Sequence, residues 1–158
     1  MSEDLVIDRE LSKEERYNQL FPQIEALLKG ESDDLANRSN FCAALKESFQ
    51  FLWVGFYRVV EGELVLGPFQ GPIACTRIKK GKGVCGQAWE RKEVIIVDDV
   101  DAFPGHIACS SESRSEIVLP LYDENDNVCA VLDIDDDKIG TFDETDRIKL
   151  QELLELIS

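Results

Sequence analysis

The sequence predicts an α+β fold in which a central antiparallel sheet is flanked by helices. Two amphipathic helical patterns precede any strand pattern, two pairs of β-branched and aromatic segments are each joined by a short turn, and a last helical pattern ends the chain. Strands joined by short turns pair antiparallel, and amphipathic helices bury their apolar stripes against such a sheet. We therefore expect the helices to lie on one face of the sheet.

The first two elements are expected to be helices. Ser12 to Glu15 has the form of a capping box, and apolar residues follow at helical spacing until Gly30 ends the pattern. Ser32, Asp33 and Asp34 then supply an N-cap and negative charge for the next helix dipole. The apolar stripes are Tyr17, Leu20, Ile24, Leu27 and Leu28 in the first helix, and Phe41, Ala44, Leu45 and Phe49 in the second.

The third and fourth elements form a predicted hairpin. Residues 52–60 and 63–69 are rich in β-branched and aromatic side chains, and Glu61-Gly62 between them favours a tight turn. A short helix is then expected from Gly83 to Trp89, and the apolar run at residues 94–97 predicts a short buried strand.

A second hairpin and a last helix follow. Residues 117–121 and 128–134 are strand patterns separated by the polar turn 123–127. Phe142 to Glu144 begins the final helix, whose apolar face consists of Ile148, Leu153, Leu154 and Ile157. The irregular stretch from Asp98 to Glu116 is longer than most connections, which predicts a functional loop or lid.

Length and composition bound the organisation of the chain. With 158 residues, of which 44% are apolar, we expect a single domain covering residues 1–158, with residues 1–10 as a loosely ordered N-terminal segment. That segment is charged, and no run approaches the roughly 18 apolar residues of a membrane span. We therefore expect a cytoplasmic protein whose five cysteines rest as thiols.

The net charge of −15, from 32 acidic and 17 basic residues, restricts the partners. Polyanions such as nucleic acid bind through their phosphates, and anionic membranes attract basic segments, so both are excluded as expected partners. Exposed apolar positions on the terminal helices would allow a homodimer.

Three cysteines, Cys75, Cys85 and Cys109, lie in turn-rich sequence. A structural thiol usually fills space inside a helix or strand, as we expect for Cys42 and Cys129. Loop positions instead favour exposure and thiol chemistry. No Cys-x-x-Cys pair accompanies the single histidine, so the spacing argues against zinc and we expect no metal.

Cys109 is the candidate nucleophile, because His106 and Arg114 are close in sequence and could lower its pKa. A buried apolar role for this thiol is the alternative. Cys75 and Cys85 could condense with an oxidised Cys109 as resolving thiols. His106 could act as a general acid or base, or could make only a loop hydrogen bond.

A second group of candidate residues is aromatic and acidic. Trp53 and Tyr57 are four residues apart on an expected strand, and Asp133 and Asp135 are two apart, so each pair shares a face. Glu116 would reach the same end of the sheet if its strand pairs in the second hairpin. The rings could enclose a small apolar or sulfonium-like substituent, and the carboxylates could bind an ammonium group. The alternative is that the rings belong to the core and the aspartates to a solvated strand end.

The sequence resembles the free methionine-R-sulfoxide reductases, a family of GAF-domain enzymes, from about Leu11 to the C-terminal helix. The motifs that carry the resemblance are Trp53-Val54-Gly55-Phe56-Tyr57, Leu66-Gly67-Pro68-Phe69-Gln70-Gly71, Gly81-Lys82-Gly83-Val84-Cys85-Gly86, Phe103-Pro104-Gly105-His106-Ile107-Ala108-Cys109, Ser115-Glu116-Ile117 and Val131-Leu132-Asp133-Ile134-Asp135. The resemblance implies a GAF-like fold with a small enclosed pocket, and it alone supplies the R stereochemistry.

The resemblance also implies roles for individual residues. Cys109 matches the attacking cysteine, Cys75 the resolving cysteine, and Cys85 a further thiol for disulfide exchange. Trp53 and Tyr57 match the walls around the substrate methyl group, and the acids that hold the substrate match Glu116, Asp133 and Asp135. The family often has Asp after the attacking cysteine and Ser after the second aspartate, where this chain has Ser110 and Asp136.

The expected reaction reduces free methionine sulfoxide through a sulfenic acid and an intramolecular disulfide, with thioredoxin as the external reductant and no bound cofactor. Two readings compete with it: a GAF module that senses a small molecule, and a redox sensor with a regulatory disulfide. Either sensor would need the cysteines or the acidic and aromatic set, whereas this sequence has both.

Overall fold

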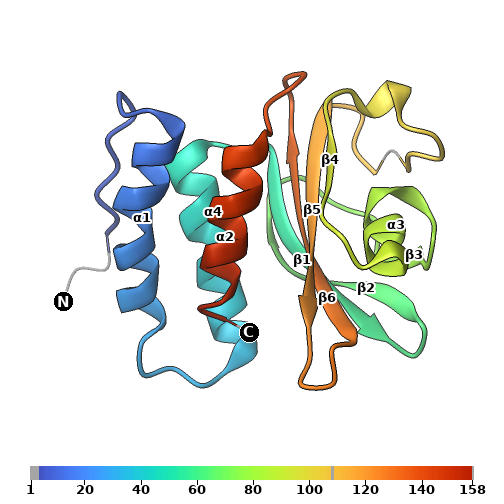
Figure 1. Ribbon diagram of the computed structural model, residues 1–158, viewed down its shortest axis with the longest axis horizontal. Coiled ribbons are helices and arrows are strands. Elements are labelled where there is room, and N and C mark those ends of the chain that lie inside the picture. Colours follow the sequence, from blue (N-terminus) through green and yellow to red (C-terminus); the bar gives the residue numbers. More distant parts are fainter. Residues whose placement is uncertain (1–3, 108, 158) are drawn as a thin grey trace.

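The computed structural model describes residues 4–107 and 109–157. Its centre is a six-stranded antiparallel sheet in the order β3-β2-β1-β6-β5-β4 (Figure 1). The strands are β1 (Trp53–Val60), β2 (Glu63–Gln70), β3 (Arg77–Lys79), β4 (Ile95–Val97), β5 (Ser115–Tyr122) and β6 (Val128–Asp136). The helices are α1 (Lys13–Leu28), α2 (Asp34–Phe49), α3 (Gly83–Arg91), α4 (Glu144–Leu154) and the short 3₁₀ helix η1 (Val100–Ala102). Ala108 of the motif around Cys109, and residues 1–3 and 158 of the expected domain, lie outside the described residues.

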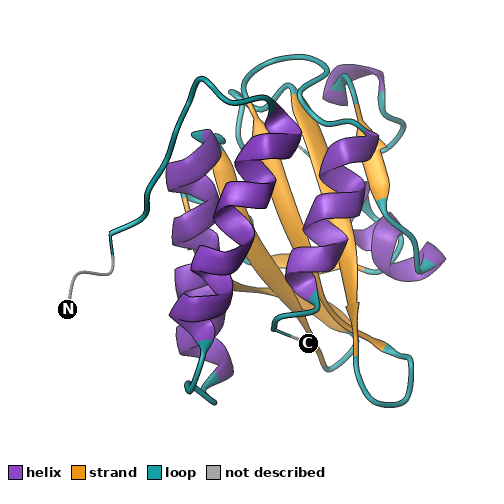
Figure 2. Cartoon of the chain, turned by 60° about the vertical axis from the view of Figure 1, so that its left-hand side comes forward, coloured by secondary structure: helices purple, strands orange, loops and turns teal. Residues whose placement is uncertain are grey.

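Helices α2 and α4 pack on one face of the sheet, and α1 packs on these two helices, farther from the sheet (Figure 1 and Figure 2). Polar side chains cap each helix start: Ser12 accepts from the backbone of Glu15, and Asp33 from that of Ala36. At α4, Asp143 and Asp146 form a reciprocal capping box. These caps satisfy donors that the first helical turn leaves unpaired, so the predicted helix starts are confirmed within about two residues.

The helix-covered face holds the larger hydrophobic core, because alternate residues of the central strands point toward the helices. Val54 and Phe56 of β1 are fully buried there. From the other strands and the helices this core receives Ile117, Leu119, Leu132, Ile134, Ile24, Phe41, Leu45 and Leu150. The predicted α+β fold with a central antiparallel sheet and two hairpins is confirmed.

The opposite face is covered by α3, so the expectation that all helices share one face is wrong (Figure 1). Gly86 permits this arrangement: a Cβ at that position would lie 2.4 Å from the backbone oxygen of Lys79 in β3. The sequence analysis missed β3, which has only three residues and no alternating apolar pattern. Together α3, β3 and the loops around them build a second, smaller core on this face.

The long connection after β4 contains η1 and then returns to the sheet. The backbone amide of Val100 donates to the carbonyl of Arg114, and that of Arg114 donates to Asp136 at the end of β6.

The N-terminal segment, which was expected to be loosely ordered, contacts α1. The backbones of Val6 and Asp8 donate to glutamine side chains of that helix. Within the described residues, no helix combines the length and the apolar character needed to cross a membrane.

Candidate active site

The register of the three central strands gathers the predicted acidic and aromatic residues on the face that α3 covers. Asp135 of β6 is paired with Trp53 of β1 on one side and with Glu116 of β5 on the other. Asp133, two residues earlier, is paired with Gly55 and Val118. Directly opposed residues in antiparallel strands project to the same side, so the three carboxylates form one cluster beside the rings.

Trp53 and Tyr57 form an aromatic wall along β1. Their ring centroids are 5.8 Å apart with planes at 25°, and Phe69 of β2 also stacks on Trp53, with ring centroids 5.3 Å apart. Gly55 makes this possible, because a Cβ there would lie 2.3 Å from the indole carbon Cη2 of Trp53. The sequence analysis assigned no role to Gly55 or Phe69, although a glycine between two aromatic residues on a strand signals such a close approach.

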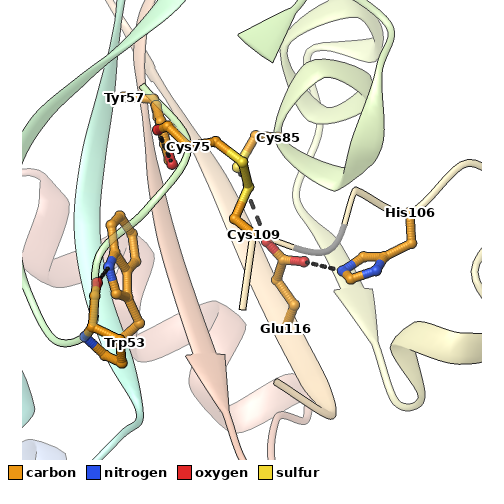
Figure 3. The surroundings of a disulfide bond; sticks show 8 residues. Trp53, Tyr57, Cys75, Cys85, His106, Cys109 and Glu116 are labelled. Atoms are coloured by element: carbon orange, nitrogen blue, oxygen red, sulfur yellow. Dashed lines mark hydrogen bonds and ion pairs between the residues drawn. A yellow bond between two sulfur atoms is a disulfide. The ribbon is translucent and has the colours of Figure 1, made fainter. Parts of the chain in front are cut away.

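Hydrogen bonds connect this wall to the segment that carries Cys75. The indole Nε1 of Trp53 donates to the carbonyl of Pro72 at 3.1 Å, and the Tyr57 hydroxyl donates to the carbonyl of Cys75 at 2.9 Å (Figure 3). The positions of the two rings and of Cys75 are therefore coupled through the backbone of one loop.

Cys75 and Cys109 form a disulfide that lies over the cluster (Figure 3). The two residues are 34 positions apart in sequence, and their Cα atoms are 5.4 Å apart, a usual separation for a disulfide. Both side chains are half-buried. The structure thus brings together the predicted nucleophile and the predicted resolving cysteine.

Cys85 is not an exposed loop thiol, which corrects the expectation from its glycine-rich surroundings. It lies in the first turn of α3, is 3% exposed, and its Sγ is 4.0 Å from Oε2 of Glu116. Gly83, at φ +63°, turns the chain into the helix so that the next residues face the sheet. Burial, reinforced by Asp133 and Glu116, raises the pKa of the Cys85 thiol well above its ordinary value.

The two remaining cysteines differ in burial. Cys42 of α2 is fully buried in the helix-side core, as expected, and burial raises its pKa to about 12. Cys129 of β6 is only half-buried at the edge of that core. Neither residue lines the pocket beneath the disulfide.

Burial raises the pKa values of all three carboxyl groups. Desolvation, with a further contribution from Asp135, raises the pKa of Glu116 to about 8. Burial likewise raises the pKa values of Asp133 and Asp135 well above the ordinary range, and each is raised further by a carboxylate neighbour. With a pKa of about 8, Glu116 is mostly protonated at neutral pH and can donate a proton.

Two polar contacts of the cluster were not predicted. Ser113, itself buried, donates to Oδ1 of Asp135 at 3.2 Å. Asp133 is 6% exposed, and its Oδ1 has no hydrogen-bond partner within the described part of the chain. A buried acceptor without a partner loses its hydration uncompensated, so Asp133 is prepared for a donor supplied by a ligand.

His106 borders the cluster, and its Nε2 lies 3.6 Å from Oε1 of Glu116 (Figure 3). Burial lowers the pKa of His106, which favours the neutral imidazole. Arg114 instead donates to the backbone carbonyls of Ser111 and Ser113. Its guanidinium is therefore engaged by its own loop, and no recorded contact supports the predicted effect of Arg114 on Cys109.

The pocket formed by these groups has a volume of about 570 Å³, including its open mouth. The rings of Trp53 and Tyr57, the acids, Cys85 and Cys109 line it, while Ile73 and Ile107 at the mouth are exposed. Such a pocket can hold a small molecule with a positively charged group and an apolar substituent beside a redox-active pair of thiols.

The two departures from the family motif lie in different places. Ser110 lines the pocket, and its hydroxyl accepts from the backbone of Glu112. Asp136 follows Asp135 on the strand, so its side chain takes the opposite face, where it accepts from the hydroxyl of Thr141. The substitution at residue 136 therefore leaves the pocket unchanged.

Comparison with known proteins agrees with this geometry. The GAF domain family matches residues 39–158. The chain is 60% identical to GAF domain-containing protein A of Dictyostelium discoideum, with 99% of both chains covered. It is 46% identical to the free methionine-R-sulfoxide reductase of Escherichia coli, covering 91% of this chain and 87% of that protein.

Among solved structures, the free methionine-R-sulfoxide reductase of Neisseria meningitidis in complex with its substrate superposes with a TM-score of 0.95. It is 49% identical, and the match covers 99% of this chain and 93% of the other. A GAF fold with a disulfide over an acidic and aromatic pocket, together with these identities over nearly the whole chain, shows that the protein belongs to the GAF-domain family of free methionine-R-sulfoxide reductases.

Proposed function

We propose that this protein reduces free L-methionine (R)-sulfoxide to L-methionine, using Cys109 as nucleophile and Cys75 as resolving cysteine. The observation that carries the proposal is the Cys75–Cys109 disulfide, which closes over a pocket in which burial raises the pKa of Glu116 to about 8. Reduction of a sulfoxide needs both an electron-donating thiol pair and protons for the departing oxygen. The relatives from Escherichia coli and Neisseria meningitidis are named as reductases of free methionine R-sulfoxide.

Each part of the substrate has a matching part of the pocket. The face of Trp53 and the ring of Tyr57 offer an apolar wall for the S-methyl group. The free oxygen of Asp133 and the carboxyl group of Asp135 are acceptors for the substrate ammonium group. Glu116, whose carboxyl group lies beside His106, is a proton donor for the sulfoxide oxygen.

The reaction balances without a bound cofactor. The Cys109 thiolate attacks the sulfur of the sulfoxide, Glu116 protonates the oxygen, and methionine leaves as Cys109 becomes a sulfenic acid. The Cys75 thiol then attacks the sulfur of that sulfenic acid and releases water, which forms the disulfide found here. An external dithiol reduces the disulfide by exchange and is itself oxidised.

We assign the external dithiol to thioredoxin, and the site of action to the cytoplasm, where thiols are kept reduced. The half-buried state of Cys75 and Cys109 at a pocket mouth supports access for such a protein. Cys85 lies beneath the disulfide and is buried against Glu116. Cys85 could therefore take part in disulfide exchange only if α3 moved away from the pocket.

The carboxylates also explain the choice of the free amino acid. A methionine sulfoxide within a peptide has no ammonium group, so the buried Oδ1 of Asp133 would stay without a hydrogen-bond partner. A site built to bond a polar substrate group rejects analogues that lack it, because its own groups lose their hydration without compensation.

Methionine formation from the R and S sulfoxides, assayed separately with a thioredoxin recycling system, tests this function. N-acetylmethionine sulfoxide serves as the control for the ammonium group. We expect turnover of the free R form, with the S form and the acetylated compound slower by at least about a hundredfold. Absence of turnover with every substrate, while Cys75 and Cys109 are shown to be reduced, would contradict the proposal and favour a sensor.

A further inference from the structure

Three metal-binding side chains from three different elements meet at the floor of the pocket. They are Cys85 of α3, Glu116 of β5 and Asp133 of β6, and one ligand atom of each lies within 4.8 Å of the other two. Cys85 Sγ and Glu116 Oε2 are 4.0 Å apart. All three side chains are buried. Sequence spacing could not reveal this set, because its members are separated along the chain by 31 and 17 positions.

A second observation indicates that the cluster is incomplete as it stands. Oδ1 of Asp133 is buried and has no hydrogen-bond partner among the described residues. A buried acceptor without a partner is costly, and a cation bound in the cluster would supply the partner that Asp133 lacks. The nearest ionic partner recorded for the cluster is His106, 3.6 Å from Glu116.

We propose that Cys85, Glu116 and Asp133 bind a thiophilic divalent cation, Zn²⁺ in the first place, in competition with the substrate. A thiolate combined with two carboxylates suits Zn²⁺, whereas Mg²⁺ and Ca²⁺ take oxygen ligands. Bonds of about 2.0 to 2.3 Å in tetrahedral geometry put ligand atoms roughly 3.5 Å apart. Three ligands at that spacing would fill three of the four tetrahedral positions and leave the fourth for water, and the ligand atoms of this cluster lie within 4.8 Å of one another.

Binding of the cation would displace protons. The Cys85 thiol loses its proton to solvent as the sulfur bonds to the metal, and any protonated carboxyl ligand does the same. The groups that face the metal position are Tyr57, Glu116, Asp133, Asp135 and His106. Protons and the cation compete for the same ligand atoms, so the affinity for the cation falls as the pH is lowered.

Competition with the substrate rests on the function proposed above, since the same acids would hold methionine sulfoxide. A cation on Glu116 and Asp133 removes the proton donor and occupies an ammonium acceptor. Neither Cys75 nor Cys109 is needed as a ligand, so the oxidised enzyme also binds the cation. The site would make the reductase reversibly sensitive to free zinc.

The test uses the full-length protein with the Cys75–Cys109 disulfide intact, so that Cys85 is the pocket thiol left to bind. Titration with Co²⁺ should give a near-ultraviolet thiolate-to-cobalt charge-transfer band that saturates at one equivalent. Calorimetry with Zn²⁺ in buffers of different ionisation enthalpy measures affinity and proton release. Mg²⁺ at the same concentration should displace neither ion.

Matched variants identify the ligands. Cys85→Ser should abolish the cobalt band and weaken Zn²⁺ binding by at least about a hundredfold, because loss of an outer-shell group alone costs 10- to 100-fold. Cys129→Ser, at a half-buried thiol outside the pocket, should keep the band. Asp133→Asn supplies a second ligand variant should Cys85→Ser fail to fold. A band that persists in Cys85→Ser, or no cobalt binding by the wild type, would overturn the proposal.

Two further measurements separate this inference from the proposed function. Added methionine sulfoxide should raise the apparent Kd for Zn²⁺ in proportion to its concentration, and an unchanged Kd would refute the competition. Turnover in the presence of a chelator reports the proposed function without the metal. Turnover without zinc binding would overturn only the metal site, whereas zinc binding without turnover would uphold the site and contradict only the reductase function.

Discussion

At the scale of single residues, the pocket separates the disulfide from the acids by burial. Cys75 and Cys109 are joined at the mouth and are half-buried, while Glu116 and Asp133 lie beneath them at 5% and 6% exposure. Burial raises the pKa values of these two acids, and in the proposed function the more exposed sulfurs are accessible to an external dithiol.

The two disulfide cysteines should respond differently to substitution. Cys109→Ser should abolish methionine formation, because a serine hydroxyl cannot attack the sulfoxide sulfur, while Tm changes little in the reduced protein. Cys75→Ser should still release about one methionine per enzyme in a rapid-quench experiment, and then stop with thioredoxin as reductant because no disulfide forms. Multiple turnovers with thioredoxin by Cys75→Ser would disprove its role as resolving cysteine.

Cys129→Ser is the matched control for both variants, since this thiol is half-buried and lies outside the pocket. It should keep wild-type turnover. Loss of activity in this variant at an unchanged Tm would show that the helix-side face of β6 takes part in the reaction, contrary to the assignment made here.

Glu116 should determine the alkaline limb of the pH profile. The acid acts when protonated, and burial raises its pKa to about 8, so the proton is present at neutral pH and is lost as the pH rises through 8. We expect kcat/KM, which reports the groups of the free enzyme, to fall above this value in the wild type. Glu116→Gln should lower kcat by about 10²- to 10⁴-fold and remove this limb. A limb unchanged in Glu116→Gln would assign it to another group.

At the scale of elements, the site depends on the register of β1, β6 and β5. Asp135 is flanked by Trp53 and Glu116, and Asp133 lies opposite Gly55. A slip of one residue would carry every one of these side chains to the helix-covered face. Apolar residues between them, such as Ile134, hold the register because they are fully buried in the larger core.

Gly55→Ala should damage substrate binding through the aromatic wall. The new Cβ would lie 2.3 Å from Trp53 Cη2 and 2.5 Å from Phe69 Cβ, so the indole must leave its position over Tyr57. We expect KM for methionine sulfoxide to rise at least tenfold, with a smaller change in kcat. Steady-state kinetics together with near-ultraviolet circular dichroism of the tryptophan would measure both effects.

Val54→Ala is the control on the same strand, because Val54 points to the opposite face and is fully buried among the helices. It should cost about 2 kcal/mol of unfolding free energy and leave KM unchanged. If both variants raised KM equally, the effect of Gly55→Ala would be general destabilisation and the aromatic-wall argument would fail.

At the scale of the whole molecule, the sheet divides stability from chemistry. The larger core lies between the sheet and α1, α2 and α4, whereas the smaller core under α3 surrounds the buried acids. Buried carboxyl groups with raised pKa values oppose folding wherever they must ionise. The stability supplied by the helix-covered face compensates for this cost.

The free energy of unfolding of the ligand-free protein should decrease as the pH rises from about 4.5 to 8. Folded Glu116 keeps its proton up to about pH 8, whereas the unfolded chain releases it near pH 4.5. Between these two values the folded state binds more protons than the unfolded state, so the free energy of unfolding falls as the pH rises. Thermal melts across this range should show a flatter profile for Glu116→Gln.

Glu93→Gln removes the same formal charge from an exposed position and controls for the general repulsion of an acidic protein. It should keep the wild-type slope of Tm against pH. Equal slopes in all three proteins would place the pH dependence in the net charge and not in the pocket.

The pattern of the sequence was sufficient to predict the helices, the two hairpins and the candidate residues of the site. Period-two alternation marked Trp53 with Tyr57 and Asp133 with Asp135 as pairs on one face, and the hairpin around residues 123–127 brought Glu116 to them. These features depend on local periodicity and turn chemistry, which a sequence carries directly.

Tertiary structure decided what depends on packing between distant segments. Glycines around Cys85 suggested an exposed loop, but Gly83 and Gly86 instead let α3 dock closely on the sheet, and the thiol became buried. Pairing of Cys75 with Cys109, the room that Gly55 leaves for the Trp53 ring, and the raised pKa of Glu116 likewise arise from contacts between segments far apart in the chain. The sequence by itself determined which groups could react, because side-chain chemistry and strand periodicity are local. Only the folded structure decided their distances and burial, and therefore the pKa values of the acids and the pairing of the cysteines.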